Sequence, residues 1–346
     1  MDMKRYLSNF VKTHSIKEIE NMIKKLKDLN VLVIGDTIID EYHFTITKGR
    51  AIKDPIISVG YDHHEIYAGG ILAIANNVSH YVNKVKLVTL LGDRKRKEDF
   101  IRNSMNKNIE LKFFTKENSP TVIKRRFLDK VRNTKLFKIE YLNDTPISKS
   151  LENKIISYLE KNLGKYDLVL VGDFGHGFIT SGIISIIEDK SKFLSVNCQT
   201  NSSNFGYNYV TKYNNLDFIV MNTEEVQLPL GNRYSSIEPL VRLLSKKTKF
   251  NQFLVSLSKE GCLYFYHDKI LKAPAFVEKT IDTVGAGDAV FAIISLLVYR
   301  NENPEVIPFI ANCVGGVAVS IMGNKESVDK EKLFNFIEKV YSDGLE

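Results

Sequence analysis

Short apolar runs rich in β-branched residues recur along the chain, and each ends near a Gly, Asp, Asn or Ser. Because successive positions in these runs are apolar, they predict strands that are buried on both faces. Stretches of helical length separate them, as at 148–163 and 235–246. We therefore expect an α/β fold with a mainly parallel central sheet covered by helices. The runs lie at 31–36, 84–93, 166–173, 192–197, 217–222 and 253–257.

Two regions have a different hydrophobic pattern: residues 42–67 and 110–142 alternate polar and apolar positions. Such alternation is typical of antiparallel strands with one exposed face, so these segments predict a small β-sheet lid attached to the main domain. Residues 1–29 place apolar side chains at helical spacing in a Lys-rich background. We expect them to form a helical N-terminal extension before a single domain that spans 30–340.

Polar residues follow the predicted strands where each strand ends. In open α/β sheets, ligands bind in the crevice outside the carboxyl ends of the strands. The sequence therefore predicts a site at this edge of the sheet. The residues expected to face it are Asp36, Asp93, Asp173, Asn197 and Asn222.

The segment 281–299 is a glycine-flanked turn that leads directly into a long apolar helix. Gly285 and Gly287 allow the backbone to turn successive N–H groups toward one point, and a helix N-terminus adds a positive dipole. Such an anion hole suits a phosphoryl group, and Asp288 beside it suits the acceptance of a proton from an attacking hydroxyl. A plain turn followed by a first-turn acid is the structural alternative.

Composition narrows the class of protein without choosing a function. The chain has 346 residues, 44% of them hydrophobic, and a net charge of +7. Its Lys and Arg residues are dispersed among 41 acidic residues, which argues against a nucleic-acid binder. The apolar run 289–299 is too short to span a membrane, and three widely spaced cysteines favour a reducing, cytoplasmic compartment. Neither a dinucleotide-binding nor a P-loop glycine pattern is present, which argues against a dehydrogenase or P-loop protein.

The glycine-containing turn at 282–288 matches a known sequence signature. The pattern Asp-Thr-x-Gly-Ala-Gly-Asp, here at 282–288, resembles the C-terminal signature of the PfkB, ribokinase-like sugar kinases. Their N-terminal signature is also matched, by Gly35, Asp36 and Asp40 and by the pair Gly69 and Gly70. The likeness runs from residue 30 to about 335. It implies a ribokinase-like three-layer sandwich and an ATP-dependent sugar kinase that uses Mg²⁺.

The resemblance also implies roles for particular residues. Asp36 and Asp40 would bind sugar hydroxyls beside Gly69 and Gly70. Asp288 would be the catalytic base, and the amides of Gly285, Ala286 and Gly287 would hold the γ-phosphoryl group. Glu225 would reach Mg²⁺ through water. The residues implied on the nucleotide side are Asn222, Glu225, Ser256, Ser258, Gly261 and Asn312.

These positions also have purely structural interpretations. Asn222 and Glu225 have the spacing of an ordinary capping box. Asp36 and Asp40 would suit a strand-end turn, Ser256 and Ser258 a polar loop, and Asn312 a polar contact between helices. The three histidines at 63, 64 and 176 have no metal-ligand spacing.

Within the family, the likeness extends to heptose 7-phosphate kinases, including the kinase half of the bifunctional enzyme of ADP-heptose synthesis. Residues 31–44, 121–140 and 254–261 carry it. It implies transfer to the anomeric hydroxyl of a heptose 7-phosphate, for surface-polysaccharide precursors, with Lys124 and Arg126 on the substrate phosphate. Exposed strands also carry such residues merely to stay soluble. The likeness further implies a homodimer through the lid and leaves open whether a monovalent cation assists near 282–288.

The sequence departs from those kinases at two places. They carry Asn in the helix after the glycine pair, where this chain has Ala73, so Asn77 or its neighbour Asn76 is expected to contact the sugar instead. They carry an Asp-Pro-Lys stretch after a central strand, where this chain has Asn-Cys-Gln-Thr-Asn at 197–201. These changes leave two alternatives: a kinase for a different sugar or sugar phosphate, and a non-catalytic binding protein. No His-x-Gly-His nucleotidyltransferase motif is present in the 346 residues.

Overall fold

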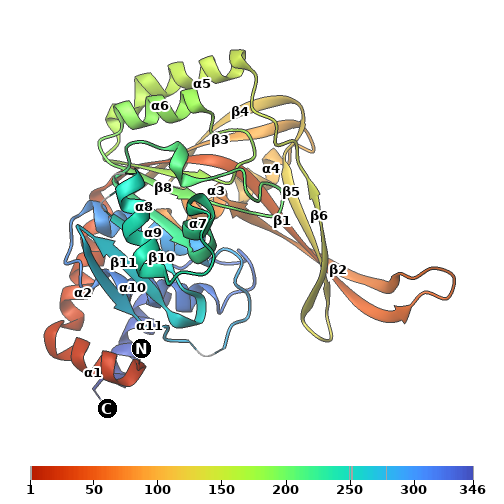
Figure 1. Ribbon diagram of the computed structural model, residues 1–346. Helices are drawn as coiled ribbons and strands as arrows, with labels where there is room; N and C mark the ends of the chain where they lie inside the picture. The colour runs from red at the N-terminus through yellow and green to blue at the C-terminus, as the bar shows by residue number, and fades with distance from the viewer. Residues whose placement is uncertain (1, 249, 251, 278, 346) are drawn as a thin grey trace.

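The computed structural model describes residues 2–248, 250, 252–277 and 279–345. Its central sheet has the strand order β12-β11-β10-β9-β8-β7-β1-β3-β4 (Figure 1). The pairs from β4 to β10 are parallel, and β11 and β12 add an antiparallel edge. The strands are β1 (Asn30–Arg50), β3 (Lys84–Arg94), β4 (Ile109–Pro120), β7 (Leu168–Asp173), β8 (Leu194–Cys198), β9 (Phe218–Asn222), β10 (Gln252–Ser256), β11 (Cys262–Tyr266) and β12 (Lys269–Ala273).

Helices cover both faces of this sheet, as the continuous apolar runs predicted. Val31 and Val33 of β1 join one apolar cluster, while Leu32 and Ile34 join the other. The first cluster includes α1 (Met3–Thr13), α2 (Ile16–Lys24), α3 (Ile71–Ser79), α4 (Glu98–Ser104), α9 (Ala286–Tyr299), α10 (Ile307–Ala318) and α11 (Lys330–Asp343). The second includes α5 (Lys149–Asn162), α6 (Ser181–Lys190), α7 (Thr223–Gln227) and α8 (Ile237–Thr248). The expected three-layer α/β sandwich is therefore confirmed.

Short 3₁₀ helices complete the connections, and the N-terminal helices pack on the same core. Phe10 of α1 stacks on Phe309 of α10 with ring centroids 4.2 Å apart. The helices expected within 1–29 are thus present and share the apolar cluster of the main sheet. Among the described residues, no helix is long and apolar enough to cross a membrane. The 3₁₀ helices are η1 (Lys25–Asp28), η2 (Leu163–Lys165), η3 (Val210–Lys212), η4 (Leu228–Leu230) and η5 (Ser258–Glu260).

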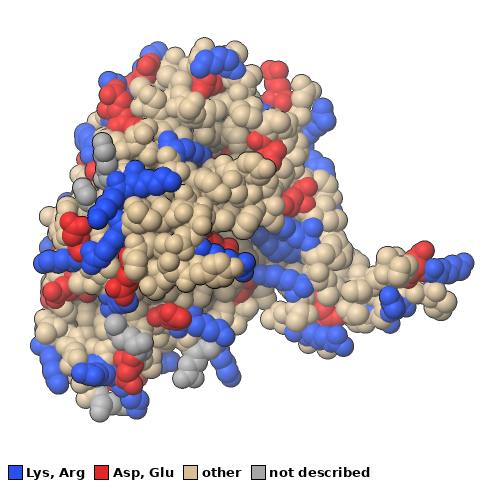
Figure 2. All heavy atoms as spheres, in the orientation of Figure 1, with Lys and Arg blue, Asp and Glu red and all other residues tan. Residues whose placement is uncertain are grey.

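A small second sheet forms the lid, with β1 as the strand shared by both sheets. Beyond Asp36, β1 pairs with β2 (Ile57–Gly70) on one side and β5 (Val122–Asp129) on the other. β5 in turn pairs with β6 (Thr134–Tyr141). The β1–β2 hairpin projects clear of the body of the molecule (Figure 1 and Figure 2).

One part of the lid prediction is wrong. Residues 109–120 form β4, which pairs in parallel with β3 at the edge of the central sheet. The second lid segment therefore begins at Val122. Its sequence alternates because an edge strand is only partly covered, so the pattern alone does not separate a parallel edge strand from a lid strand.

Candidate active site

A cavity of about 820 Å³ lies between the lid and the helical layer that contains α9 and α10. Most of the residues expected from the sequence line it, although they come from segments far apart in the chain. Lid residues form one end, and residues of α10 and of the segment after β12 form the other. The expected residues found there are Asp40, Gly70, Lys124, Arg126, Asn222, Glu225, Ser256, Ser258, Gly261, Gly285, Ala286, Gly287, Asp288 and Asn312.

The turn before α9 has the backbone geometry that its glycines predicted. Gly285 adopts φ 84° at the helix N-cap, a left-handed conformation that favours glycine. A Cβ at this position would also collide with the side-chain oxygen of Asn324. At Gly287, by contrast, a Cβ would meet no atom within 4 Å, so the first turn of α9 borders open space. The first turn of α9 therefore borders the cavity, as an anion hole requires, while the Ala286 amide donates to the Thr283 carbonyl at 3.3 Å.

Asp288 lies in that first turn, with an apolar helix behind it, and is only 7% exposed. Burial raises the pKa of its carboxyl group from 3.8 to about 7, although a hydrogen bond from Gln199 acts in the opposite direction. A carboxylate with a pKa near neutrality is well matched to proton transfer at physiological pH. Asp288 can thus accept a proton and shed it again.

Gln199 holds the carboxyl group of Asp288, and the sequence did not predict this role. Its Nε2 donates to Asp288 Oδ1 at 2.6 Å and to Asn197 Oδ1 at 2.7 Å. Asn197 Nδ2 donates to the carbonyl of Val220 at 3.0 Å, and that carbonyl can only accept. The Asn197 oxygen must therefore face Gln199, which fixes the Gln199 amide as a donor to Asp288. The departure at 197–201 marked this residue, but no local pattern linked it to Asp288.

Glu225 caps the start of α7 and also lines the cavity. Its Oε2 accepts from the Asn222 amide at 2.9 Å and the Asn222 side chain accepts in return, so the capping box is present. Its Oε1 accepts from the Thr200 amide at 3.0 Å. Burial raises the pKa of the Glu225 carboxyl group to about 7. Both residues nevertheless line the cavity, and each carboxylate oxygen retains a second lone pair.

Glu225 is one acid of the cavity that could serve Mg²⁺. Among the described residues, no group of three or more His, Cys, Asp or Glu is placed to hold a metal ion. Mg²⁺ keeps several waters and uses one or two carboxylates together with substrate phosphates. Glu225, which lines the cavity, fits this requirement if it acts through a water molecule.

The residues expected on the nucleotide side also line the cavity. Ser256 Oγ donates to the Met221 carbonyl at 3.4 Å. Asn312 Nδ2 donates to the Ala273 carbonyl at 3.0 Å, which ties α10 to the end of β12. Ser258 and Gly261 have positive φ values of 53° and 101° and form the tight turn between β10 and β11. All four border the cavity, and their polar atoms are partly engaged in holding its walls.

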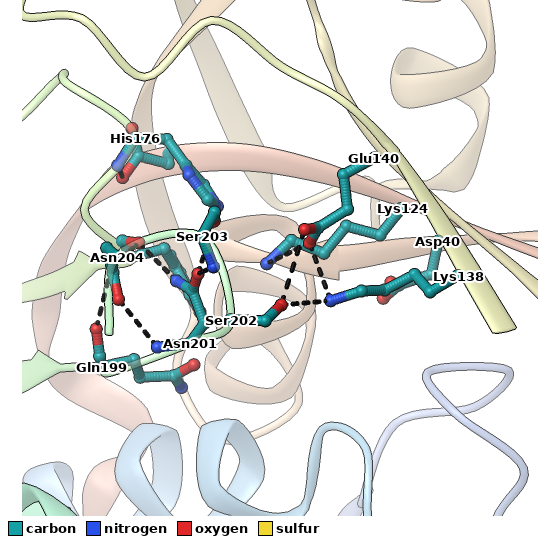
Figure 3. Close-up of polar contacts among 12 residues, drawn as sticks. Asp40, Lys124, Lys138, Glu140, His176, Gln199, Asn201, Ser202, Ser203 and Asn204 are labelled. Atoms are coloured by element: carbon teal, nitrogen blue, oxygen red, sulfur yellow. Dashed lines mark hydrogen bonds and ion pairs between the residues drawn. The ribbon is translucent and has the colours of Figure 1, made fainter. Parts of the chain in front are cut away.

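Charged side chains crowd the lid end of the cavity. Arg126 donates to Asp40 Oδ1, and Asn324 Nδ2 donates to Asp40 Oδ2 at 3.1 Å. Figure 3 shows Lys124 and Lys138 converging near Glu140 and Ser202. Lys138 Nζ lies 2.9 Å from Glu140 Oε1 and donates to Ser202 Oγ at 2.7 Å. Lys138 and Asn324 were missed, because nothing local in their sequence distinguishes them from ordinary surface residues.

The side chain of Lys124 is the least compensated of these cations. Its Nζ lies 4.0 Å from Glu140 Oε1, and burial lowers its pKa from the ordinary value. Three cations, Lys124, Arg126 and Lys138, here face two carboxylates, Asp40 and Glu140. The lid end thus carries an excess of positive charge.

Three residues expected to bind substrate do not border the cavity. Asp36 is buried in the central sheet, where it accepts from the His176 amide at 3.3 Å, and burial with nearby Asp173 raises its pKa to about 7. Gly69 packs against the back of Asp40, where a Cβ would collide with that carboxylate. Asn77 is turned into the core, where it donates to the Ala73 carbonyl and accepts from the Val328 amide, both at 2.9 Å.

These positions correct the expected substrate contacts. The reason is that β1 does not end at Asp36 but continues to Arg50, which carries Asp40 rather than Asp36 over the cavity. Asn76, the alternative to Asn77, instead donates to the Ser104 carbonyl at 3.0 Å. Asp93 and Asp173 are also bound elsewhere, the first by the Asn118 amide at 2.8 Å and the second by Lys212 at 2.5 Å.

Comparison with solved structures identifies the same architecture. The ribokinase of Arabidopsis thaliana complexed with ribose and ATP superposes with a TM-score of 0.69, covering 90% of this chain and 99% of that one at 15% identity. Phosphofructokinase-2 from Escherichia coli in complex with potassium gives 0.70, covering 92% and 100% at 13% identity. At such low identity these matches show the ribokinase-like fold alone.

Sequence comparison is more specific. The bifunctional protein HldE of a Nitratiruptor species is 25% identical over 296 residues, which is 85% of this chain and 62% of that protein. HldE of Aliarcobacter butzleri is 26% identical over 308 residues, which is 86% and 62% respectively. The chain thus spans less than two thirds of these relatives. The pfkB family carbohydrate kinases match residues 28–331, and such kinases transfer phosphate from ATP to a sugar. The chain therefore belongs to the pfkB family of carbohydrate kinases.

Proposed function

We propose that this protein transfers the γ-phosphoryl group of ATP to a hydroxyl of a sugar phosphate, the anomeric hydroxyl of a heptose 7-phosphate. The observation that carries this proposal is the position of Asp288. It lies in one cavity with the glycine turn that begins α9 and with Asp40 of the lid. A base, an anion hole and a polar acceptor site are the parts that phosphoryl transfer needs.

The chain's own residues support each part of the reaction. Asp40, fixed by Arg126 and Asn324, accepts a hydrogen bond from a sugar hydroxyl. The oxygen of the sugar hydroxyl forms the new bond to the γ-phosphorus, and the bond between that phosphorus and the ADP oxygen breaks. Asp288 takes the proton of the attacking hydroxyl on the carboxylate oxygen that Gln199 does not bind. The amides at the start of α9 stabilise charge on the transferred oxygens.

Mg²⁺ would neutralise the phosphate charges when it is bound with the nucleotide. Glu225 is the residue that would hold one of its waters, and Asn222 orients that carboxylate through the capping box. The position of the lid over the acceptor end would exclude water from the site, so that transfer competes successfully with hydrolysis of ATP.

The excess positive charge at the lid end supports an acceptor that is already phosphorylated. Lys124 and Lys138 lie on neighbouring strands, β5 and β6, and both line the cavity. A phosphate held there by two ammonium groups would lie at the end of the cavity away from the nucleotide. Arg126, by contrast, is occupied by Asp40, so we assign it to the support of that carboxylate rather than to phosphate.

The proposal is tested by a substrate panel. The purified protein is incubated with ATP and Mg²⁺ and with heptose 7-phosphate, fructose 6-phosphate, sedoheptulose 7-phosphate, ribose or fructose. ATP consumption is followed, and phosphorus NMR locates the new phosphate. Turnover selective for the heptose phosphate, with a 1,7-bisphosphate product, is expected. Preference for an unphosphorylated sugar would contradict the role of Lys124 and Lys138, and ATP binding without any turnover would favour a non-catalytic protein.

We also propose that two copies associate through their lids. Large apolar side chains are exposed along the lid strands, including Ile46, Tyr61 and Phe137. Light scattering after gel filtration should give a dimer mass, and Phe137→Ser should shift it toward the monomer. Tyr207→Ser, at an aromatic residue that is 91% exposed outside the lid, serves as the control. A monomeric protein at micromolar concentration would contradict this proposal.

A further inference from the structure

The carboxylate of Asp282 begins the turn that leads to Asp288, and it is almost completely buried, with 4% of the residue exposed. Four donors reach its two oxygens. Oδ1 accepts from Lys135 Nζ at 2.6 Å and from the Val284 amide at 3.1 Å. Oδ2 accepts from the Tyr42 hydroxyl at 3.0 Å and from the Gly323 amide at 3.1 Å. A carboxylate has about four acceptor directions, so its capacity is fully used.

Lys135 is the one charged donor among these four. It belongs to β6 of the lid and reaches across to the turn, whereas Val284 and Gly323 donate through fixed backbone amides. The Asp282 side chain is 2% exposed and that of Lys135 is 42% exposed, so the ammonium group enters from the solvent side. The carboxylate thus obtains its neutralising charge from the lid.

The positive charge of Lys135 matters because Asp282 lies in the same turn as the proposed phosphoryl site. An unneutralised carboxylate six residues before Asp288 would oppose a phosphoryl group held by the amides of the same turn. A cation at Asp282 removes that repulsion. Sugar kinases of this fold can bind a monovalent ion, as the potassium complex of phosphofructokinase-2 illustrates. In this chain, however, a cation approaching the Asp282 carboxylate would find its four acceptor directions taken, one of them by an ammonium group, so these residues do not fit an added ion.

We propose that the ammonium group of Lys135 is a built-in counter-ion for Asp282 that makes phosphoryl transfer independent of an added monovalent cation. This inference rests on the proposed function, because it concerns the same turn. Because Lys135 is a lid residue, its ammonium group is next to Asp282 only when the lid is in place.

The experiment compares initial rates in potassium and in tetramethylammonium buffers of equal ionic strength. Wild-type turnover is expected to agree within two-fold between them. Lys135→Met should lose ten-fold or more without potassium and should gain five-fold or more when potassium is added. Lys135→Arg keeps the charge and should stay within about three-fold of wild type. Lys130→Met, at a lid lysine that pairs with Asp62 instead, should behave like the wild type.

Three results would overturn the inference: five-fold stimulation of the wild type by potassium, full activity of Lys135→Met without it, or equal losses in the Met and Arg variants. Melting curves supply a readout that does not need turnover. Potassium should raise the melting temperature of Lys135→Met relative to tetramethylammonium and leave the wild type unchanged, and the reverse pattern would also overturn the inference. If no acceptor is phosphorylated, the proposed function fails, and the melting comparison still decides the role of Lys135.

Discussion

The two ends of the cavity are built in different ways. The phosphoryl end is one contiguous segment, 282–288, in which backbone amides and a single helix N-terminus form the anion hole. The acceptor end is assembled from side chains of three lid strands and the loop after β8, which meet only in the folded chain. A backbone site is common to any sequence that forms the turn, whereas a side-chain site changes with each substitution. In the proposed function, the chemistry is therefore fixed at one end of the cavity, and the choice of sugar is set at the other.

The buried acids at the two ends of the cavity differ in the charge of their hydrogen-bond partners. Asp288 and Glu225 accept hydrogen bonds from neutral donors, namely the Gln199 amide and backbone N–H groups. Burial therefore raises both of their pKa values to about 7. Asp40 and Glu140 at the acceptor end are instead paired with Arg126 and Lys138. In the proposed function, Asp288 of the first pair takes the proton and Glu225 holds a water of Mg²⁺, whereas the second pair serves electrostatic recognition of the acceptor.

The largest expected effect comes from removing the base. Asp288→Asn keeps the shape of the side chain but cannot accept the proton, so kcat should fall by about 10²–10⁴-fold. The KM for ATP should change little, because the amides of the turn remain. Steady-state kinetics measures both, and Asp189→Asn, at an exposed acid on α6, is the matched control. A variant with near wild-type kcat would remove Asp288 from the reaction and with it the contrast between the ends.

A smaller effect is expected at the acceptor end. Lys138→Met removes one of the two cations assigned to the substrate phosphate. A hydrogen bond to a charged group contributes about 1.5–3 kcal/mol, so KM for the sugar phosphate should rise by roughly 10–100-fold. Because Lys138 is remote from the base, kcat should stay within a few-fold of wild type.

Lys130→Met, on the lid surface, provides the comparison for Lys138→Met. An unchanged KM, or a loss confined to kcat, would show that Lys138 only pairs with Glu140 and Ser202. An unphosphorylated sugar, if it is turned over at all, should be insensitive to the change.

Gln199 holds the carboxyl group of Asp288 at the phosphoryl end, and its removal should have a moderate effect. Its hydrogen bond favours the ionised form of Asp288, so Gln199→Leu should raise the pKa of that carboxyl group further. The acid limb of the kcat/KM profile should move to higher pH, and kcat at pH 7 should fall by about ten-fold. Gln227→Leu, outside the cavity, is the control. A drop in kcat without any movement of the acid limb would make Gln199 merely structural.

Much of the phosphoryl end was predictable, because its signals are local in the sequence. The turn, the helix from Ala286 and the central strands follow from runs of neighbouring residues. The partner of Asp288 was not predictable, since Gln199 lies 89 residues away and the contact depends on the packing of α9 against the end of β8. Asp36 and Asp40 show the same limit. Both follow one apolar run, and only the unpredicted continuation of β1 into the lid decides which of them faces the cavity.

The last expected effect concerns stability and leaves activity aside. The folded protein holds the proton of Asp288 up to about pH 7, whereas the unfolded chain releases it near the ordinary value of 3.8. Between these values the unfolded state binds fewer protons, so this group's contribution to stability falls as pH rises through the window and is constant above it. An Asn side chain cannot ionise, so the Asp288→Asn variant does not lose this stability. Relative to wild type, Asp288→Asn should therefore gain unfolding free energy from pH 5 to pH 7, by at most about 1.4 kcal/mol per pH unit. Urea titrations at both pH values measure the gain, and Asp189→Asn should show none. A difference that is independent of pH would mean that Asp288 is ionised throughout this range, and the contrast between the two ends of the cavity would lose its electrostatic basis.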